Sequence, residues 1–251
     1  MKKTIETLLM MVLALTVFTG CTEDEGTEPG HDGTPVATLY QYTASGEDMT
    51  ENDCLFRIAT NAAVREVYYM AELKTAKEER NMSDDQYAEL VVTQGTKVEI
   101  NASDTKEVII KDLHGVYDIT VVAVNGGSRT AQTITFAGPD YKPFGTGTYT
   151  SDLFGNIGKV DIEYSAIGNR YRIVSIWAAN HGFSFSPDGT SVTVFPSQME
   201  TGFNDKNHGM VSVTDQGSSY DEAAKTFTFL FKFSAEDGYV YGVGNETLVM
   251  D

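Results

Sequence analysis

Apolar and polar residues alternate along most of the chain after residue 35. The clearest case is Phe227, Phe229, Phe231 and Phe233, which alternate with Thr226, Thr228 and Lys232. A period of two is that of a β-strand with one buried face. Similar short segments, separated by turn residues, predict strands at residues 39–43, 54–60, 67–73, 97–100, 108–111, 117–123, 129–136, 160–164, 171–177, 183–186, 191–195, 210–214, 226–233, 239–243 and 247–250. The pattern therefore predicts an all-β protein.

The first group of strands, within residues 35–138, predicts one domain. Asn125-Gly126-Gly127 is a hairpin signal, and seven short strands with turns between them are typical of a β-sandwich. The run Leu113-His114-Gly115-Val116-Tyr117 resembles the end of a fibronectin type III or related immunoglobulin-like domain, in which a Tyr after a turn opens the penultimate strand. His114 lies in that turn and is interpreted as a turn residue.

One helix, near residues 83–94, is expected inside this domain. Ser83 with Gln86 three positions later fits a capping box, and Gly95 supplies a stop. The apolar residues Tyr87, Leu90 and Val91 fall on one face of this helix. A plain immunoglobulin-like fold has no such helix, so we expect it to cover an edge or an end of the sandwich.

Residues 139–145 are predicted to be a linker, because Pro139 and Pro143 together with Gly145 disfavour both helix and central strand. Alternation resumes after it, so residues 146–251 form a second all-β domain. Periodicity does not choose between a sandwich and a partly closed barrel. The expected architecture is two β-sandwich-like domains in tandem, the first immunoglobulin or fibronectin type III-like with one inserted helix.

The start of the chain reads as a secretory signal peptide over residues 1–20. Lys2 and Lys3 precede an apolar run over residues 8–18, which is too short to span a membrane as a helix. Thr19-Gly20-Cys21 resembles the lipobox of bacterial lipoproteins, which implies that the Cys21 thiol carries lipid and that cleavage precedes it. The alternative is an ordinary signal peptide with Cys21 incidental.

Residues 21–34 lack apolar residues to bury and are expected to form a flexible acidic tether. Glu23-Asp24-Glu25 resembles the export signal that sends Bacteroidetes lipoproteins to the outer cell surface. The expected location is therefore the outer membrane, anchored by lipid and facing the cell exterior; the alternative is a solvating spacer on a periplasm-facing protein. The net charge of −18 opposes binding to nucleic acid or to anionic lipid.

A wider resemblance covers the whole chain. The motifs are Phe144-Gly145-Thr146-Gly147-Thr148-Tyr149, Asn169-Arg170-Tyr171-Arg172-Ile173, and Ser219-Tyr220-Asp221 followed by Lys225-Thr226-Phe227. With the lipobox and the domain order, they resemble uncharacterised two-domain surface lipoproteins of gut Bacteroidetes. Many proteins of that kind accompany glycan-uptake machinery, which implies a glycan or a surface protein as partner.

The chain carries no motif for a phosphate loop, a zinc protease, a nucleophile elbow or a C-x-x-C site, so no enzyme, cofactor or metal is predicted. Cys54 shares strand parity with Phe56 and is interpreted as a small buried hydrophobe. The polar cluster 204–208 lacks the spacing of a calcium loop and is interpreted as a solvated loop. Asp161 and Glu163 share one strand face, which favours a solvent-facing side over a carboxylate pair.

The candidate ligand-binding residues are Trp177, Asn180 and His181. A tryptophan at a strand end beside amide and imidazole groups can stack on a sugar ring and bond its hydroxyls. The alternative is that Trp177 anchors the core, since it shares parity with Ile173. The resulting expectation is a non-enzymatic accessory binding protein; the alternatives are a structural or adhesive subunit that binds proteins, and a hydrolase built from scattered carboxylates.

Overall fold

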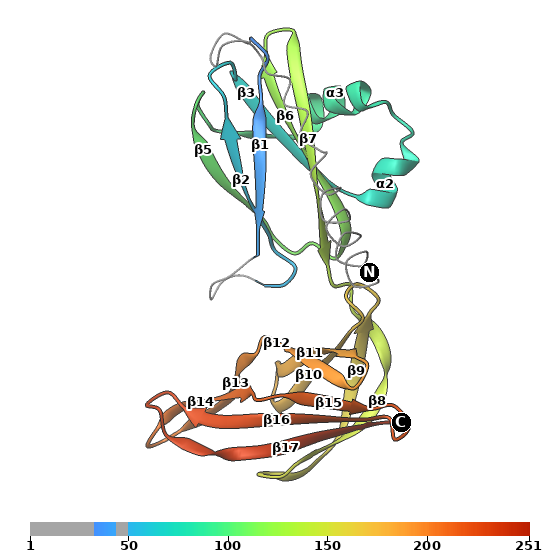
Figure 1. Cartoon of the computed structure of the whole chain (residues 1–251), viewed down its shortest axis with the longest axis vertical. Coiled ribbons are helices and arrows are strands. Elements are labelled where there is room, and N and C mark those ends of the chain that lie inside the picture. The colour runs from blue at the N-terminus through green and yellow to red at the C-terminus, as the bar shows by residue number, and fades with distance from the viewer. Residues whose placement is uncertain (1–32, 44–49) are drawn as a thin grey trace, which may run out of the picture.

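The computed structural model describes residues 33–43 and 50–251, and this part of the chain is all-β with two short helices, as the alternation predicts (Figure 1). The predicted signal peptide, Cys21 and all but the last two residues of the tether 21–34 lie outside the described residues. None of the described helices is long and apolar enough to cross a membrane.

The first half of the described chain forms two antiparallel sheets with strand orders β1-β2-β5 and β4-β3-β6-β7. The strands are β1 (Ala37–Tyr42), β2 (Cys54–Thr60), β3 (Glu66–Leu73), β4 (Thr96–Val98), β5 (Thr105–Ile110), β6 (Gly115–Asn125) and β7 (Ser128–Gly138). Phe56 and Ile58 from one sheet meet Val67 and Ile119 from the other in a fully buried core. Cys54 is buried in this core, as predicted, and burial raises the pKa of its thiol to about 11.

The predicted helix is present as α3 (Asp84–Gln94), and its capping box is formed. The Ser83 hydroxyl accepts the Gln86 N–H at 3.3 Å, and the Gln86 side chain accepts the Ser83 N–H at 2.9 Å. A second helix, α2 (Lys74–Glu79), directly follows β3 and was not predicted. It buries none of its residues, so it leaves no apolar face in the sequence.

α3 covers the outer face of the four-stranded sheet, where edge or end coverage was expected. Tyr87 and Val91 of the helix pack on Val122, which points away from the core residues Val121 and Ala123 of β6. This explains why β6 is apolar on both parities: one side faces the core and the other faces α3.

Gly95 ends α3 in an extended conformation (φ −76°), without the left-handed stop that helix-ending glycines often supply. The glycine is required for space. A Cβ there would lie 2.4 Å from the Val91 carbonyl oxygen and 2.6 Å from that of Tyr69.

The junction between the halves is short and hydrogen-bonded. β7 ends at Gly138 and β8 begins at Lys142, so the strand starts inside the expected linker. The buried Asn52 amide donates to the Leu113 carbonyl at 2.9 Å and to the Pro139 carbonyl at 2.8 Å. Glu51 accepts from the Tyr141 hydroxyl at 2.8 Å and forms an ion pair with Arg170.

The second half is a closed β-barrel, which resolves the choice left open between a sandwich and a partly closed barrel. Its ten-stranded sheet contains β8 (Lys142–Ser151), β9 (Gly155–Ser165), β10 (Arg170–Ala178), β11 (His181–Asp188), β12 (Ser191–Phe195), β13 (Gln198–Asp205), β14 (Gly209–Asp215), β15 (Ser218–Asp221), β16 (Thr226–Ala235) and β17 (Val240–Met250). β17 pairs with both β16 and β8, and this double pairing closes the barrel. β14 of the β13–β14 hairpin pairs with the second half of β16, and β13 lies against β10 and β11.

Aromatic side chains fill the barrel. Phe227, Phe229, Phe231 and Phe233 of β16 are fully buried, as their alternation predicts, and alternate rings of β11 meet them from across the interior. The Phe183 ring lies 4.8 Å from the Phe229 ring in an edge-to-face contact. Barrels of this size close tightly enough for side chains to fill the interior.

The two ends of the barrel are formed by different sets of turns. β8 enters from the first half of the molecule and runs to the opposite end, where the β8–β9, β10–β11 and β16–β17 turns gather because consecutive strands are antiparallel. The β13–β14 turn joins them. We call this end, made of residues 152–154, 177–181, 201–208 and 236–244, the distal rim.

Candidate ligand-binding site at the distal rim of the barrel

The three residues predicted to bind a ligand lie on one hairpin at the distal rim, but they do not form one surface. The indole of Trp177 packs in the barrel beside Phe183, Phe231 and Phe233, with ring centroids 5.9, 6.1 and 6.3 Å away. Its Nε1 atom is buried and has no hydrogen-bond partner. The ring is therefore placed to support the rim from inside.

Asn180 lies in the two-residue turn that follows β10, and His181 begins β11. Asn180 is exposed, has a left-handed backbone (φ 62°), and donates its N–H to the Ser175 hydroxyl at 3.0 Å. His181 Nδ1 lies 2.9 Å from the Ala179 carbonyl oxygen. The His181 ring lies against Gly202 of β13, where a Cβ would come within 2.6 Å of it. The hairpin is therefore braced against β13.

Regular strand pairing breaks at several points of this rim. The register of β10 with β11 shifts between Ile173 and Ala178, and that of β13 with β14 shifts between Glu200 and Asn204. Phe233 pairs with Gly242 while Ser234 pairs with Val240, which leaves Tyr241 as an extra, bulged residue. Bulges at barrel rims re-aim side chains and are common beside functional sites.

An aromatic cluster forms where the β13–β14 and β16–β17 turns meet. The His208 ring stacks on the Tyr239 ring at 4.1 Å and 12°, and the Tyr241 ring lies 5.1 Å from Tyr239 at 79°. Tyr239 is 49% exposed and Tyr241 is 37% exposed. We call Tyr239, Tyr241 and His208 the rim aromatic cluster. Two tyrosine rings that remain accessible offer apolar faces to a ligand.

Two carboxylates hold the rim aromatic cluster in place. Asp237 accepts from His208 Nδ1 at 2.9 Å and from the Tyr239 N–H at 2.9 Å, and these contacts, the imidazole first, lower the pKa of Asp237. The Asn207 N–H and then the Tyr241 hydroxyl lower the pKa of Asp205. Burial and then the Asp205 carboxylate raise the pKa of Tyr241 to about 12. The Tyr241 hydroxyl therefore stays protonated at neutral pH.

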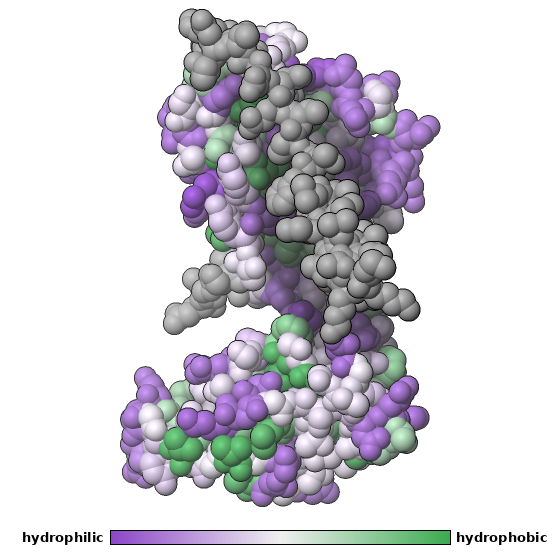
Figure 2. Space-filling view, in the orientation of Figure 1, coloured by the Kyte–Doolittle hydropathy of each residue, from purple (hydrophilic) through white to green (hydrophobic). Residues whose placement is uncertain are grey.

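Further large apolar side chains of the distal rim are exposed. Phe154 and Phe203 are each 60% exposed, and Val243 is 54% exposed. Figure 2 shows hydrophobic residues gathered over the β16–β17 part of the barrel, among polar ones. An exposed apolar surface with a polar surround marks an interaction site more often than scattered single residues do.

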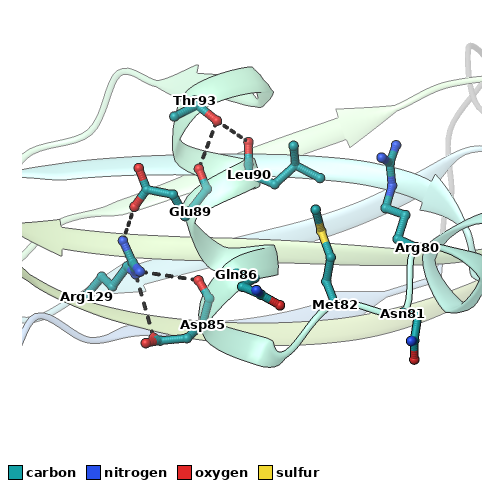
Figure 3. A pocket seen from close by; sticks show the side chains of 9 residues that line it. All are labelled: Arg80, Asn81, Met82, Asp85, Gln86, Glu89, Leu90, Thr93 and Arg129. Carbon is teal, nitrogen blue, oxygen red and sulfur yellow. Dashed lines mark hydrogen bonds and ion pairs between the residues drawn. The ribbon is translucent and has the colours of Figure 1, made fainter.

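A hollow lies beside α3 in the first half of the molecule. It measures about 650 Å³, and Figure 3 shows Arg129 held between Glu89 and Asp85 on one side of it and Arg80 on the other. Both guanidinium groups are already paired, since Arg80 also forms a salt bridge with Glu72 at 2.6 Å. This hollow therefore offers no unpaired charge to a ligand.

The other polar residues considered in the sequence lie apart from one another. Asp161 is exposed on β9, and Glu163 pairs with Arg172 at 2.6 Å. His114 bonds the Asp112 carboxylate at 2.7 Å and the Pro139 carbonyl at 3.2 Å, so it lies in a turn as interpreted. Within residues 33–43 and 50–251, no three His, Cys, Asp or Glu side chains come close enough together to hold a metal ion.

No protein-family model, curated protein or solved structure matches the chain. The geometry of the distal rim therefore carries the functional argument. Sequence reasoning missed the rim aromatic cluster because His208 and Tyr239 belong to different hairpins. The available signal was the glycine-rich spacing of Gly238, Gly242 and Gly244 around Tyr239 and Tyr241, which indicates an irregular strand.

Proposed function

We propose that this protein is a lipid-anchored, non-enzymatic binding protein of the outer cell surface that captures glycans at the distal rim of its barrel. The observation that carries the proposal is the rim aromatic cluster: two accessible tyrosine rings fixed by His208 and by carboxylates. Sugar rings present apolar C–H faces and hydroxyl edges, which fit aromatic faces bordered by hydrogen-bonding groups.

The charges of the rim narrow the ligand class. Asp152, Asp205, Glu236 and Asp237 lie around the rim, with Lys206 as the lysine among them. Negative charge repels acidic sugars, so neutral sugars or amino sugars are the ligands that the rim favours.

The first half of the molecule acts in this proposal as a spacer. Its strands divide into sheets of three and four with the orders β1-β2-β5 and β4-β3-β6-β7, an arrangement that supports the fibronectin type III-like assignment. The proposed lipid on Cys21 and the acidic residues after it lead into this half, while the rim lies at the far end of the barrel. The spacer would hold the binding surface away from the membrane.

The proposal is tested with the mature chain beginning at residue 21, with Cys21→Ser to prevent lipid attachment. A glycan array identifies ligands, and titration calorimetry compares the chain with its Tyr239→Ala variant. We expect the variant to bind more than tenfold more weakly, a loss of about 1.4 kcal/mol or more.

Tyr40→Ala is the matched control, because Tyr40 is 51% exposed on β1, away from the barrel. It should bind with unchanged affinity. An array without hits, or equal affinities for the wild type and Tyr239→Ala, would refute glycan capture at the rim and favour the structural or adhesive alternative.

A further inference from the structure

The β8–β9 turn closes the mouth of the barrel. The Leu153 side chain lies over Gly244 and Gly242 of β17: a Cβ on Gly244 would be 3.3 Å from Leu153 Cγ, and one on Gly242 3.6 Å from Leu153 Cδ2. The Phe154 ring meets the Phe233 ring edge-to-face at 5.3 Å. Because Gly242 and Gly244 occupy interior positions opposite Phe233 and Phe231, this turn acts as a lid over the barrel interior.

One buried hydroxyl ties the lid to a buried carboxylate. Ser151 donates to Glu246 Oε1 at 2.5 Å and accepts the N–H groups of Leu153 at 3.2 Å and of Phe154 at 3.0 Å. The hydroxyl thereby uses its single proton and both lone pairs. Any movement of the Glu246 carboxylate out of its site breaks the contact that orients the backbone of the lid.

Glu246 is poorly compensated in its buried position. The residue has 0% exposure, and its Oε2 atom has no hydrogen bond of good geometry. The buried Tyr149 hydroxyl lies close enough to the carboxylate to lower its pKa, and it has no other hydrogen-bond partner. On β8 and its turn, the titratable groups that face Glu246 are Tyr149 and Asp152; on β16, the residue opposite Glu246 is Phe229, which carries no charge. No cation therefore balances the ionised carboxylate from these elements.

Burial dominates the proton affinity of this carboxylate. It raises the pKa of Glu246 to about 7, against the lowering effect of the Ser151 and Tyr149 hydroxyls, and the charge of Asp152 raises it further. Burial and the Glu246 charge in turn raise the pKa of Tyr149, so that hydroxyl stays protonated. A carboxylate that reaches water titrates near 4.5. Ionisation therefore favours a conformation in which Glu246 meets solvent.

We propose that Glu246 is a pH-dependent latch: its neutral form holds the Asp152–Phe154 lid closed, and its ionisation releases the lid. The lid borders the rim aromatic cluster through β17, because Asp152 Oδ2 accepts both the Asn245 N–H at 2.9 Å and the Asn245 amide at 3.1 Å. Asn245, which lies four residues after Tyr241 on β17, is thus hydrogen-bonded to the lid. The regulation of ligand capture rests on the proposed function, but the movement of the lid does not.

The latch is tested on the mature chain by hydrogen exchange. Protection factors of the Leu153 and Phe154 amides, corrected for the pH dependence of intrinsic exchange, are measured between pH 5.5 and 8.5. We expect at least a tenfold fall in protection between pH 5.5 and about 7, with a plateau at higher pH. In Glu246→Gln, which stays neutral, protection should remain high throughout. Asp161→Asn, an exposed carboxylate of the same barrel, should behave like the wild type.

Trp177 supplies an independent readout because it is the single tryptophan of the chain and its ring lies 6.3 Å from Phe233, on which Phe154 rests. Its emission should change over the same pH range in the wild type and not in Glu246→Gln. If Glu246→Gln does not fold, Ser151→Ala replaces it and should show low lid protection at every pH. Lid protection independent of pH in the wild type would overturn the latch.

Ligand binding separates this inference from the proposed function. With a glycan hit in hand, its affinity should change across pH 7 in the wild type and stay constant in Glu246→Gln. A pH-dependent lid in a protein that binds no glycan would keep the latch and refute glycan capture. A glycan bound equally well at every pH, with constant lid protection, would support glycan capture and refute the latch.

Discussion

The imidazole of His208 lies on the ring of Tyr239, 4.1 Å between centroids and 12° from parallel. The two residues come from different hairpins, and Asp237 joins them by accepting a hydrogen bond from each. One face of Tyr239 is thus covered by His208, and the residue as a whole remains half exposed. The ring is immobilised before any ligand arrives, which reduces the entropy cost of binding.

Trp177 and Tyr239 should respond oppositely to truncation. Trp177→Ala removes a ring that contacts Phe183, Phe231 and Phe233, and we expect it to lower the free energy of unfolding by about 3–5 kcal/mol. Tyr239→Ala removes an exposed ring and should change it by about 0.5 kcal/mol or less. Urea denaturation followed by circular dichroism measures both. A Trp177→Ala variant as stable as the wild type would remove the core role of this residue.

Gly182 is needed for space in the irregular β10–β11 pairing. A Cβ there would lie 1.8 Å from the Ile173 carbonyl oxygen, so Gly182→Ala must displace backbone and should cost more than about 2 kcal/mol. Gly145→Ala is the control, since nothing lies within 4 Å of its added Cβ. It should alter stability by less than about 1 kcal/mol. Thermal unfolding of the two variants distinguishes them, and equal melting temperatures would contradict this account of the bulge.

Most strands were predictable because each needs only its own alternation of apolar and polar residues; β8 and β15 were not predicted. The four phenylalanines of β16 and the Cys54–Thr60 strand are found where the pattern places them. β13 was missed because its bulge around Gly202 and Phe203 interrupts the alternation. Barrel closure was not predictable, since it depends on β8 pairing with β17 about one hundred residues later, and register between distant strands leaves no local pattern.

The distal rim could not be predicted for the same reason, because it depends on contacts between distant parts of the chain. The polar cluster containing His208 and the strand containing Tyr241 were each recognised, but nothing local indicates that they meet. The sequence left two roles open for Trp177, a core anchor and a ligand-binding residue. Strand parity assigns sides only in a regular strand, whereas Trp177 lies in an irregular part of β10.

Glu246 should make the stability of the protein depend on pH. Its pKa is about 7 in the folded state and near 4.5 when exposed, so the folded state binds more protons between these values. The free energy of unfolding should therefore fall as pH rises from about 4.5 to 7, by on the order of 3 kcal/mol at most. Groups with lowered pKa values act in the opposite direction at lower pH, so the comparison uses variants at matched pH.

Glu246→Gln isolates this contribution. We expect the variant to match the wild type at pH 5 and to exceed its free energy of unfolding at pH 8, because the variant has no buried charge to form. Urea denaturation at both pH values measures the difference, with Asp161→Asn as the control that should not change it. If the free energy of unfolding depended on pH equally in the wild type and in Glu246→Gln, burial would not raise the pKa of Glu246, and this prediction would be wrong.

Cys21 should decide where the protein resides. In the proposed lipoprotein, Cys21→Ser removes the only site of lipid attachment, so the full chain expressed in a Bacteroidetes host should move from the membrane fraction to the soluble fraction. Cys54→Ala should leave it in the membrane fraction, because Cys54 lies in the core of the first half. Proteinase K added to intact cells should degrade the wild type while a periplasmic marker survives. Protection of the wild type would place it on the periplasmic side, and a glycan captured at the rim would then have to cross the outer membrane first.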